Sequence, residues 1–195
     1  DWQQWVNTFE RPGREIYDRR HAIVAASRVR PGMTIADIGA GTGLYTRLFA
    51  TAVKPGGTVY AIDISDTFID NILRTCREQD LSNVTGIVNT PMDIGLSADT
   101  IDLAFIAATY HHFEYPVQTL ASIHQALRSD GRVIIIDFRR DPRISSNWVM
   151  GHGRGNRAQV IEEMQAAGFR LVDDKPLLRT NYFLEFVKTA KDQGG

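Results

Sequence analysis

Ile35-Ala-Asp-Ile-Gly-Ala-Gly-Thr-Gly-Leu44 is the stretch of the chain that decides its fold. It joins a predicted strand over residues 33 to 38 to a predicted helix over residues 44 to 53. Glycines let a backbone turn sharply and approach a ligand closely. The N–H groups at the start of a helix favour a ligand at the carboxyl edge of the sheet. The stretch therefore predicts a ligand site at the edge of a parallel sheet.

Two features separate this loop from the dinucleotide fingerprint Gly-x-Gly-x-x-Gly. The last glycine of that fingerprint, which packs the helix on the strand, would fall at Leu44. Asp37 would face a pyrophosphate unfavourably, whereas a cofactor with an ammonium and a sulfonium gains from a negative charge. Asp63, at the end of the next strand, can accept hydrogen bonds from ribose hydroxyls. A nicotinamide-dependent oxidoreductase is disfavoured, and a glycine turn with an unrelated acid is the simpler alternative.

The rest of the pattern alternates helical stretches with short β-branched runs, as in a parallel sheet covered on both faces. We predict helices over residues 14 to 29, 65 to 79, 116 to 127 and 159 to 167. The other strands are expected over residues 58 to 62, 84 to 88, 101 to 107, 132 to 138, 169 to 172 and 182 to 187. Ser65 is the expected N-cap of its helix, and Gly168 is expected to end the last helix.

The connections between these elements define the topology further. Ser129-Asp130-Gly131 is predicted as a turn, and residues 139 to 155 as an irregular loop. About nine residues separate the last two strands, which is too short for a helical crossover, so these strands should pair antiparallel. The sequence thus predicts an α/β fold with a Rossmann-like, seven-stranded, mostly parallel sheet.

Composition limits the partners. The chain has 195 residues and a formal charge of −1, with 22 basic and 23 acidic residues, so we expect one domain that binds a small molecule and neither nucleic acid nor a membrane. The single cysteine, Cys76, allows no intrachain disulfide and fits the cytoplasm. No signal-like or membrane-spanning apolar run is visible, although a chain beginning at Asp1 leaves a removed leader open. Monomer and homodimer are equally open.

Taken together, these motifs resemble those of the class I S-adenosylmethionine-dependent methyltransferases. The stretch from Asp37 to Gly43 resembles their first motif, and Ala61-Ile-Asp63 resembles the acid after strand two. Thr90-Pro-Met-Asp93 resembles the segment along the adenine, and Ser129-Asp130-Gly131 the turn before strand five. The resemblance covers roughly residues 20 to 188. It implies the strand order 3-2-1-4-5-7-6, with strand 7 antiparallel, S-adenosylmethionine as cofactor and S-adenosylhomocysteine as product.

The resemblance also implies the residues around the cofactor. Asp93 would meet the adenine amino group, Met92 would lie on the adenine face, and Tyr17 would contact the carboxylate end. The full predicted set is Asp37, Gly39, Ala40, Gly41, Gly43, Asp63, Ile64, Met92, Asp93, Ala107 and Tyr17. Residues 1 to 30 would form a helical lid carrying Trp2, Trp5 and Phe9, or a helix packed on the sheet or a partner, and residues 31 to 190 the cofactor-binding core.

Within this superfamily, the chain is similar to the small ubiquinone/menaquinone-biosynthesis-like members of the methyltransferase domain 11/25 type. The Asn/Asp-Pro-Pro-Tyr/Phe motif of amino-group methyltransferases is absent, since Ala108-Thr-Tyr-His-His-Phe113 stands in its place. One cysteine also cannot supply the thiolates of arsenite methyltransferases. The resemblance therefore implies methyl transfer to an oxygen, nitrogen or carbon of a small molecule. A non-catalytic module that binds the cofactor is the alternative.

The candidate reaction centre follows strand four. His111 and His112, with Tyr110, are the candidate catalytic residues, because histidine takes up protons near neutral pH. The alternative is that one histidine packs under the loop and the other caps a helix. Asp137 and His152 could converge there, with Asp137 orienting a histidine or contacting substrate. Without a short His-x-x-His spacing no metal is predicted. The arginines of the 139 to 155 loop would hold an anionic substrate or, as we favour, simply form a solvated face.

Overall fold

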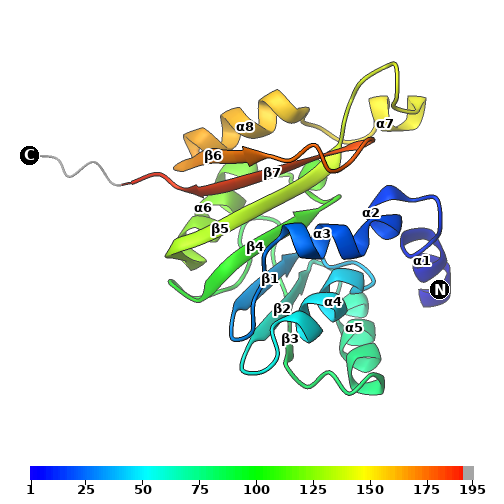
Figure 1. Ribbon diagram of the computed structural model, residues 1–195, viewed down its shortest axis with the longest axis vertical. Helices are drawn as coiled ribbons and strands as arrows, with labels where there is room; N and C mark the ends of the chain where they lie inside the picture. Colours follow the sequence, from blue (N-terminus) through cyan, green and yellow to red (C-terminus); the bar gives the residue numbers. More distant parts are fainter. Residues whose placement is uncertain (191–195) are drawn as a thin grey trace, which may run out of the picture.

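Seven strands form one sheet in the order β3-β2-β1-β4-β5-β7-β6 in the computed structural model, which describes residues 1–190 (Figure 1). β7 runs antiparallel to β5 and β6, and the other pairs are parallel. The predicted fold class and strand order are confirmed; residues 191–195, predicted as part of the same domain, lie outside the described residues. The strands are β1 (Thr34–Ile38), β2 (Thr58–Asp63), β3 (Val84–Val88), β4 (Ile101–Ala107), β5 (Leu127–Phe138), β6 (Phe169–Asp174) and β7 (Asn181–Lys188).

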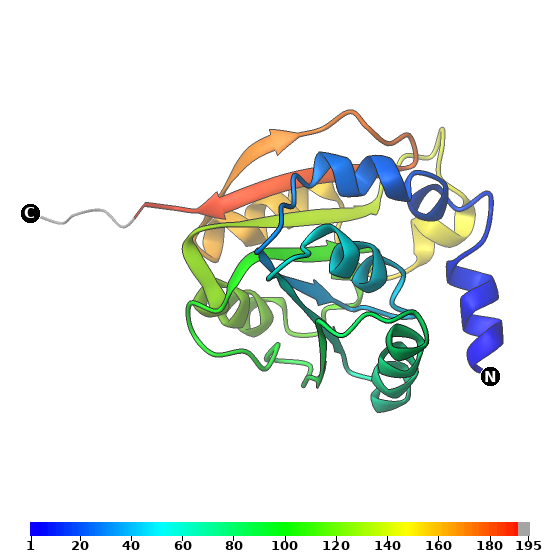
Figure 2. The same cartoon turned by 60° about the horizontal axis from the view of Figure 1, so that its bottom comes forward.

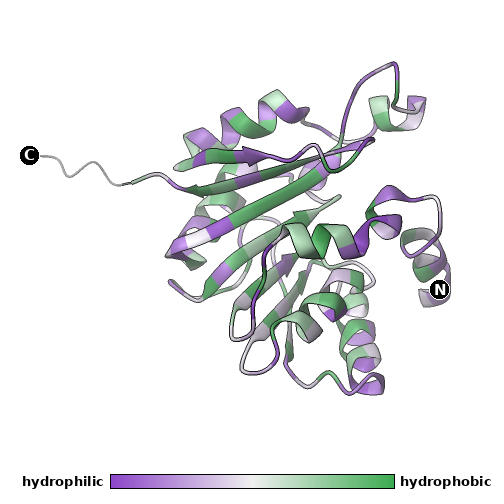
Figure 3. Cartoon of the chain, in the orientation of Figure 1, coloured by the Kyte–Doolittle hydropathy of each residue, from purple (hydrophilic) through white to green (hydrophobic). Residues whose placement is uncertain are grey.

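Helices cover both faces of the sheet, and each face has its own apolar core (Figure 3). Ile23, Phe49 and Ile72 lie in the core of one face, while Leu120, Val160 and Met164 lie in that of the other. Burial of such side chains contributes about 1.5–3 kcal/mol each. The helices of the first face are α2 (Glu15–Asp18), α3 (Arg20–Ala26), α4 (Leu44–Ala52) and α5 (Asp66–Glu78). Those of the second are α6 (Pro116–Ala126) and α8 (Arg157–Ala166).

Several local predictions are confirmed by the backbone. The Ser65 hydroxyl accepts a hydrogen bond from the Phe68 N–H and so caps α5. Gly168 follows α8 with φ of +90°, the left-handed conformation that favours glycine after a helix. Cys76 is buried in the α5 core, where it acts as a small apolar side chain.

Three predicted boundaries are wrong. The helix expected over residues 14 to 29 is split into α2 and α3 at Arg19, whose ψ of 15° departs from helical geometry. Ser129-Asp130-Gly131 is not a separate turn but lies within β5. There, Ile101 pairs with Leu127 and Leu103 with Arg132, so that residues 128 to 131 form an irregularity in the strand. The loop of residues 139 to 155 also contains a short helix, α7 (Asn147–Gly151), capped by Ser146.

The carboxyl ends of the parallel strands meet two additional elements (Figure 2). α1 (Trp2–Phe9) and α7 both lie at this edge of the molecule, α1 beside the first half of the sheet and α7 beyond β5. Open parallel sheets bind ligands at this edge. Among the residues described, no helix combines the length and the apolarity needed to span a bilayer.

Candidate active site

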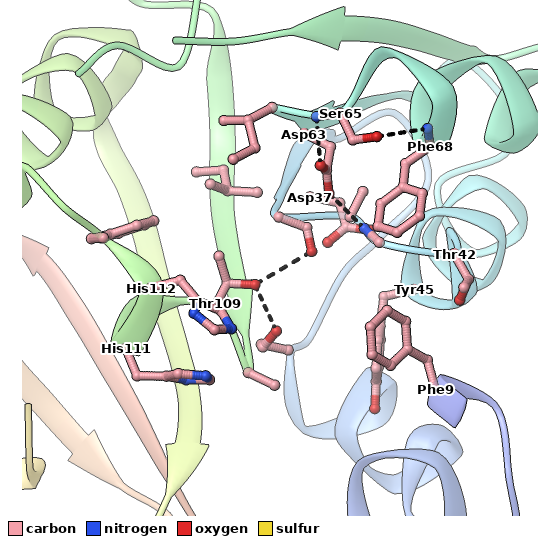
Figure 4. A pocket seen from close by; sticks show the side chains of 18 of the residues that line it. Phe9, Asp37, Thr42, Tyr45, Asp63, Ser65, Phe68, Thr109, His111 and His112 are labelled. Carbon is pink, nitrogen blue, oxygen red and sulfur yellow. Dashed lines mark hydrogen bonds between the residues drawn. The ribbon is translucent and has the colours of Figure 1, made fainter. Parts of the chain in front are cut away.

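A cavity of about 700 Å³ lies between the carboxyl ends of β1, β2, β4 and β5 and the helices α1 and α7. Its volume falls in the range of pockets that bind small molecules and cofactors. Figure 4 shows that its wall has two chemically different parts, with Asp37 and Asp63 on one side and His111 and His112 on the other. The cavity thus unites the two groups of residues that the sequence singled out.

The glycine loop forms the first part of the wall. Gly39 and Gly41 have φ of +71° and +58°, a backbone conformation that side chains other than glycine rarely adopt. The N–H groups of Gly39 and Ala40 both donate to the carbonyl of Ile62, which ties the loop to β2. A Cβ on Gly39 would lie 2.3 Å from two atoms of the Thr109 side chain. The loop and the segment after β4 therefore approach each other as closely as a glycine permits.

Two buried carboxylates face the loop. Asp37 accepts a hydrogen bond of 2.7 Å from the Thr46 hydroxyl, and Asp63 accepts from the N–H groups of Gly41 and Ser65 at 2.9 and 3.0 Å. Burial raises the pKa of Asp37 to about 7, and repulsion from Asp63 contributes to this rise. Burial also raises the pKa of Asp63, against the opposing effect of its backbone hydrogen bonds. Both charges are thus costly without a cation beside them.

The helix α1 covers the carboxylate side of the cavity. Glu10, at its end, forms an ion pair of 2.6 Å with Arg47 and accepts a hydrogen bond from the hydroxyl of Thr42 in the glycine loop. The Trp5 ring packs edge-on against Phe68 of α5, with centroids 5.6 Å apart. The N-terminal segment is therefore fastened to both α4 and α5 across the cavity.

A histidine–aspartate pair forms the second part of the wall. His111 Nδ1 lies 2.9 and 3.0 Å from the two carboxylate oxygens of Asp137, and the His111 backbone N–H donates to the same carboxylate at 3.1 Å. Both side chains are buried. Because a carboxylate accepts hydrogen bonds, Nδ1 carries the proton and the Nε2 lone pair remains available on the other side of the ring. The predicted role of Asp137 in orienting a histidine matches this geometry.

The loop after β5 completes the site. The guanidinium group of Arg140 donates hydrogen bonds to the carbonyls of Val149, His152 and Gly155 and so folds the loop onto itself. The Trp148 ring stacks on His152 with centroids 4.0 Å apart. The prediction that the arginines of this loop form a solvated face is therefore wrong for Arg140, whose side chain is bonded to the backbone of the loop itself.

Most of the predicted site residues line the cavity. The residues of both groups that do so are Asp37, Gly39, Ala40, Gly41, Asp63, Ile64, Ala107, His111 and His112. His152 also lines it, whereas Asp137 lies directly behind His111. The expectation that residues far apart in the sequence would meet at the sheet edge therefore agrees with the structure.

Five predicted residues lie outside the wall of the cavity: Gly43, Met92, Asp93, Tyr17 and Tyr110. Thr90 forms a turn in which its hydroxyl accepts from the N–H groups of Met92 and Asp93, so this turn leaves both of them exposed. Tyr17 stacks with Arg20 instead. Tyr110 is fully buried and donates its hydroxyl to Glu163, away from the cavity. The contacts predicted for these five residues stay predictions, and the described cavity wall does not include them.

Other lining residues had not been predicted. Thr109 spans the cavity floor, and its hydroxyl bonds to the carbonyls of Gly39 and Ala107. Arg14 lies in the wall whereas Tyr17 does not, and Pro91 lies in the wall whereas its neighbour Met92 does not. The basic and aromatic residues of the first twenty positions were the available signal for Arg14. Trp148 carried no local signal, because its place depends on the folded loop.

Comparison with known proteins connects this geometry to a family. A family model described as a methyltransferase domain matches residues 36–135, just over half of the chain. The ubiquinone/menaquinone biosynthesis C-methyltransferases UbiE of Burkholderia vietnamiensis and Burkholderia cenocepacia are 29% and 30% identical over 122 residues. These residues make up 60% of this chain and 48% of the Burkholderia proteins, so the chain spans about half the length of the curated relatives it matches.

Solved structures share the whole fold. A SAM-dependent methyltransferase from Aquifex aeolicus has a TM-score of 0.84 at 22% identity and covers 95% of this chain and 97% of its own. The [4+2]-cyclase SpnF has a TM-score of 0.71 at 21% identity, over 85% of this chain and 63% of its own. At such identities these likenesses show the fold. Together with the family match and the glycine loop, they show that the chain belongs to the methyltransferase domain 11 family of class I S-adenosylmethionine-dependent methyltransferases.

Proposed function

We propose that this chain transfers the methyl group of S-adenosylmethionine to a small molecule, at an oxygen, nitrogen or carbon atom that loses a proton in the reaction. The observation that carries the proposal is the polarity of a single cavity. Its glycine loop and buried acids suit the cofactor, and His111, on the opposite wall (Figure 4), is oriented by Asp137 and suits an acceptor that must be deprotonated. An imidazole can take the proton of an O–H, an N–H or an acidic C–H group, so the proposal includes all three kinds of acceptor atom.

The residues present fit a cationic nucleoside cofactor. Asp37 and Asp63 are acids whose pKa is raised chiefly by burial, so their charged forms are costly, and an ammonium or sulfonium group would stabilise them. A carboxylate has about four lone-pair positions. The Asp63 carboxylate accepts hydrogen bonds from the N–H groups of Gly41 and Ser65, and its remaining acceptor positions would take the ribose hydroxyls. Arg14 would hold the carboxylate of the cofactor, and Pro91 would lie along the adenine.

His111 is the proposed proton acceptor. When bound, the cofactor supplies an electrophilic methyl group on a positively charged sulfur, which the acceptor attacks as the sulfur–methyl bond breaks. The acceptor's proton passes to Nε2 of His111, and the Asp137 carboxylate stabilises the imidazolium that forms. Proton transfer by a positioned group of this kind contributes typically 10²- to 10⁴-fold to the rate.

In this proposal α1 and α7, which cover the cavity, contribute to catalysis by excluding water. The α1 aromatic side chains and Trp148 of α7 shield the space between the acids and His111, which excludes water and fixes the reactants in line. We therefore infer that α1 acts as a lid, whereas α3 packs on the sheet through Ile23. The Phe138 ring beside His111, and the Trp148 ring packed against Phe138, favour a flat, largely apolar acceptor with an acidic O–H, such as a phenol. The carbon methylation named for the Burkholderia relatives is compatible with such an acceptor.

The affinity for the cofactor should depend on pH through Asp37. Because its pKa is raised to about 7 in the ligand-free protein, most molecules carry a neutral Asp37 at pH 6 and a charged one at pH 8. A cationic ligand selects the charged form, so the affinity for S-adenosylmethionine should be about tenfold weaker at pH 6 than at pH 8. Calorimetric titration at both pH values measures this ratio.

Asp37→Asn is the control for this pH dependence, since it removes the titrating group and leaves the titration of the ligand unchanged. The variant should bind more weakly and lose most of the tenfold ratio. The ligand-free protein gives a second readout. The folded state binds the Asp37 proton more tightly than the unfolded chain, whose aspartate has a pKa of about 3.9, so this contribution to stability falls as pH rises from about 4 to about 7. A ratio that survives in Asp37→Asn would contradict the assignment.

Parallel calorimetric titrations with S-adenosylmethionine, S-adenosylhomocysteine and NAD test the proposed function directly. We expect micromolar binding of the two sulfur compounds and no response to NAD. A panel of phenols, carboxylic acids and amines then tests turnover, measured as S-adenosylhomocysteine formed. NAD binding alone would overturn the proposal. Tight cofactor binding without turnover of any class in the panel would instead favour a non-catalytic module.

A further inference from the structure

Three histidine side chains meet at the acceptor side of the cavity. One ligand nitrogen from each of His111, His112 and His152 lies within 4.8 Å of the other two. Their ring centroids are 4.0 Å apart for His111 and His112, and 5.1 and 5.2 Å apart for the two pairs with His152. We propose that these three imidazoles bind one divalent transition-metal ion of the zinc class, with a fourth coordination position open to the cavity.

The geometry allows closure around one ion. Zinc–nitrogen bonds of about 2.0–2.1 Å place the nitrogens of a tetrahedral site roughly 3.4 Å apart. Nitrogens that already lie within 4.8 Å of one another reach this separation by small side-chain rotations. His111 is fixed by its buried surroundings, whereas His112 is exposed and His152 half-buried, so the two outer rings are able to rotate toward it. Three protein ligands and one open position are the arrangement of catalytic zinc sites.

The support behind His111 is that of a metal ligand. Histidines that bind metals donate their other ring N–H to a carboxylate or carbonyl, which fixes the tautomer and makes the ligand nitrogen more basic. The His111 Nδ1–H does this to Asp137, at 2.9 and 3.0 Å from its two oxygens. Asp137 itself is held by the N–H groups of His111 and Phe138. The Nε2 lone pair is thereby preset on the side away from Asp137.

The loop after β5 is shaped to bring the third ligand to the other two. A Cβ on Gly153, whose φ is +67°, would lie 2.8 Å from the His111 ring and 2.9 Å from the His111 carbonyl. Only glycine permits so close an approach in this conformation. The N–H of Arg154 donates to the same carbonyl at 3.3 Å, and Trp148 stacks on His152. The backbone on the C-terminal side of His152 thus packs against His111, and this packing brings the His152 ring beside the other two.

The donor set selects the class of metal. Imidazole nitrogens suit Zn²⁺, Fe²⁺, Ni²⁺ and Cu²⁺, whereas Mg²⁺ and Ca²⁺ need oxygen ligands that this trio does not offer.

The consequence for catalysis rests on the proposed methyl transfer and deepens it, but the bound ion would take over the activation of the acceptor that is assigned above to His111. With an ion bound, the His111 lone pair is committed to the metal, and the open position would take an oxygen of the acceptor as its anion. A bound cation lowers the pKa of such an oxygen. The acceptor would then lose its proton to solvent on binding, rather than to His111. This assigns the substrate class as oxygen-containing acceptors that bind metal ions.

The test measures metal and cofactor binding in the same preparation. The purified protein is stripped with a chelator and titrated with Zn²⁺ against a chromophoric competitor, and with Co²⁺ by visible spectroscopy. We expect one equivalent at micromolar affinity or tighter, with the absorption of four-coordinate Co²⁺. His112→Ala and His152→Ala should weaken binding at least about 100-fold, and Asp137→Asn roughly 10- to 100-fold.

His21→Ala is the matched control, because His21 is an exposed histidine on α3 outside the cavity. Its zinc affinity should equal that of the wild type. Zinc affinity in His152→Ala that also equals the wild type, or no saturable zinc binding at all, overturns the proposal. Titration with S-adenosylmethionine separates the two ideas. Cofactor binding without zinc binding removes the metal site alone, whereas zinc binding without cofactor binding leaves the metal site in place and removes the proposed methyl transfer.

Discussion

Gly39→Ala is expected to weaken S-adenosylmethionine binding at least about 100-fold and to destabilise the ligand-free protein by about 2–4 kcal/mol. The added Cβ would lie 2.3 Å from both Cγ2 and Oγ1 of Thr109 and 2.7 Å from its Cβ. The φ of +71° adds strain of about 1–2 kcal/mol for any other residue. Relief requires the glycine loop and the segment after β4 to move apart, which spoils the surface facing the cofactor. Calorimetric titration and thermal unfolding measure the two effects.

Two further variants separate the collision from the backbone strain. Gly13 has φ of +93°, and a Cβ added there would have no other atom within 4 Å, so Gly13→Ala carries strain alone and should leave cofactor affinity nearly unchanged. Thr109→Gly in the Gly39→Ala background removes all three colliding atoms and should recover part of the lost affinity. Equal affinity losses in Gly39→Ala and Gly13→Ala would show that the contact with Thr109 is not the cause.

Asp63→Ala should reduce the affinity for S-adenosylmethionine by about 10²- to 10⁴-fold. Two hydrogen bonds to a charged acceptor contribute about 1.5–3 kcal/mol each, and the variant loses both of those proposed for the ribose. In the wild type the Gly41 N–H donates a hydrogen bond of 2.9 Å to Asp63. The variant loses this bond, so the glycine loop is held less firmly. Titration with S-adenosylhomocysteine, which carries the same ribose but no sulfonium, should show a loss of similar size.

The stability of the variants distinguishes a binding role for Asp63 from a structural one. Asp63→Asn removes a charge that burial makes costly, but it also loses one of the two backbone hydrogen bonds, because an amide has a single acceptor oxygen. Its free energy of unfolding should therefore stay within about 2 kcal/mol of the wild type, while its cofactor affinity falls far more. Asp66→Asn makes the same change of charge three residues further on, at an exposed position outside the cavity. Cofactor affinities that match between Asp63→Asn and Asp66→Asn would exclude Asp63 from the site.

The fold could be predicted because its determinants act over short distances in the sequence. The glycine loop, the Ser65 cap and the Gly168 terminator each depend on residues within a few positions. The antiparallel end of the sheet followed from the length of one loop. The division of the first long helix did not follow. The carboxylate of Glu15 accepts hydrogen bonds from the backbone of Thr180 and Asn181, a long-range contact that no periodicity encodes.

The positions of site residues could be predicted by segment, but side-chain direction could not. Tyr110 and His111 are adjacent, yet the 3₁₀ turn of Tyr110–His112 sends the first into the core toward Glu163 and the second toward the cavity. Likewise, the turn after Thr90 places Pro91 in the cavity wall and leaves Met92 outside it. Which neighbour points inward depends on a few backbone angles, which the residue pattern does not encode.

The hydrogen bonds by which Arg140 folds its own loop bear on how the site could change in evolution. Two of the three clustered histidines lie inside the matched family segment of residues 36–135, whereas His152 lies beyond it, on a loop whose shape is set largely by its own Arg140. A lineage could gain or lose the third imidazole by a single codon change there without disturbing the inherited nucleoside-binding half. On the proposed metal site, a relative with the same nucleoside-binding half but no histidine at this position would lack one of the three ligands.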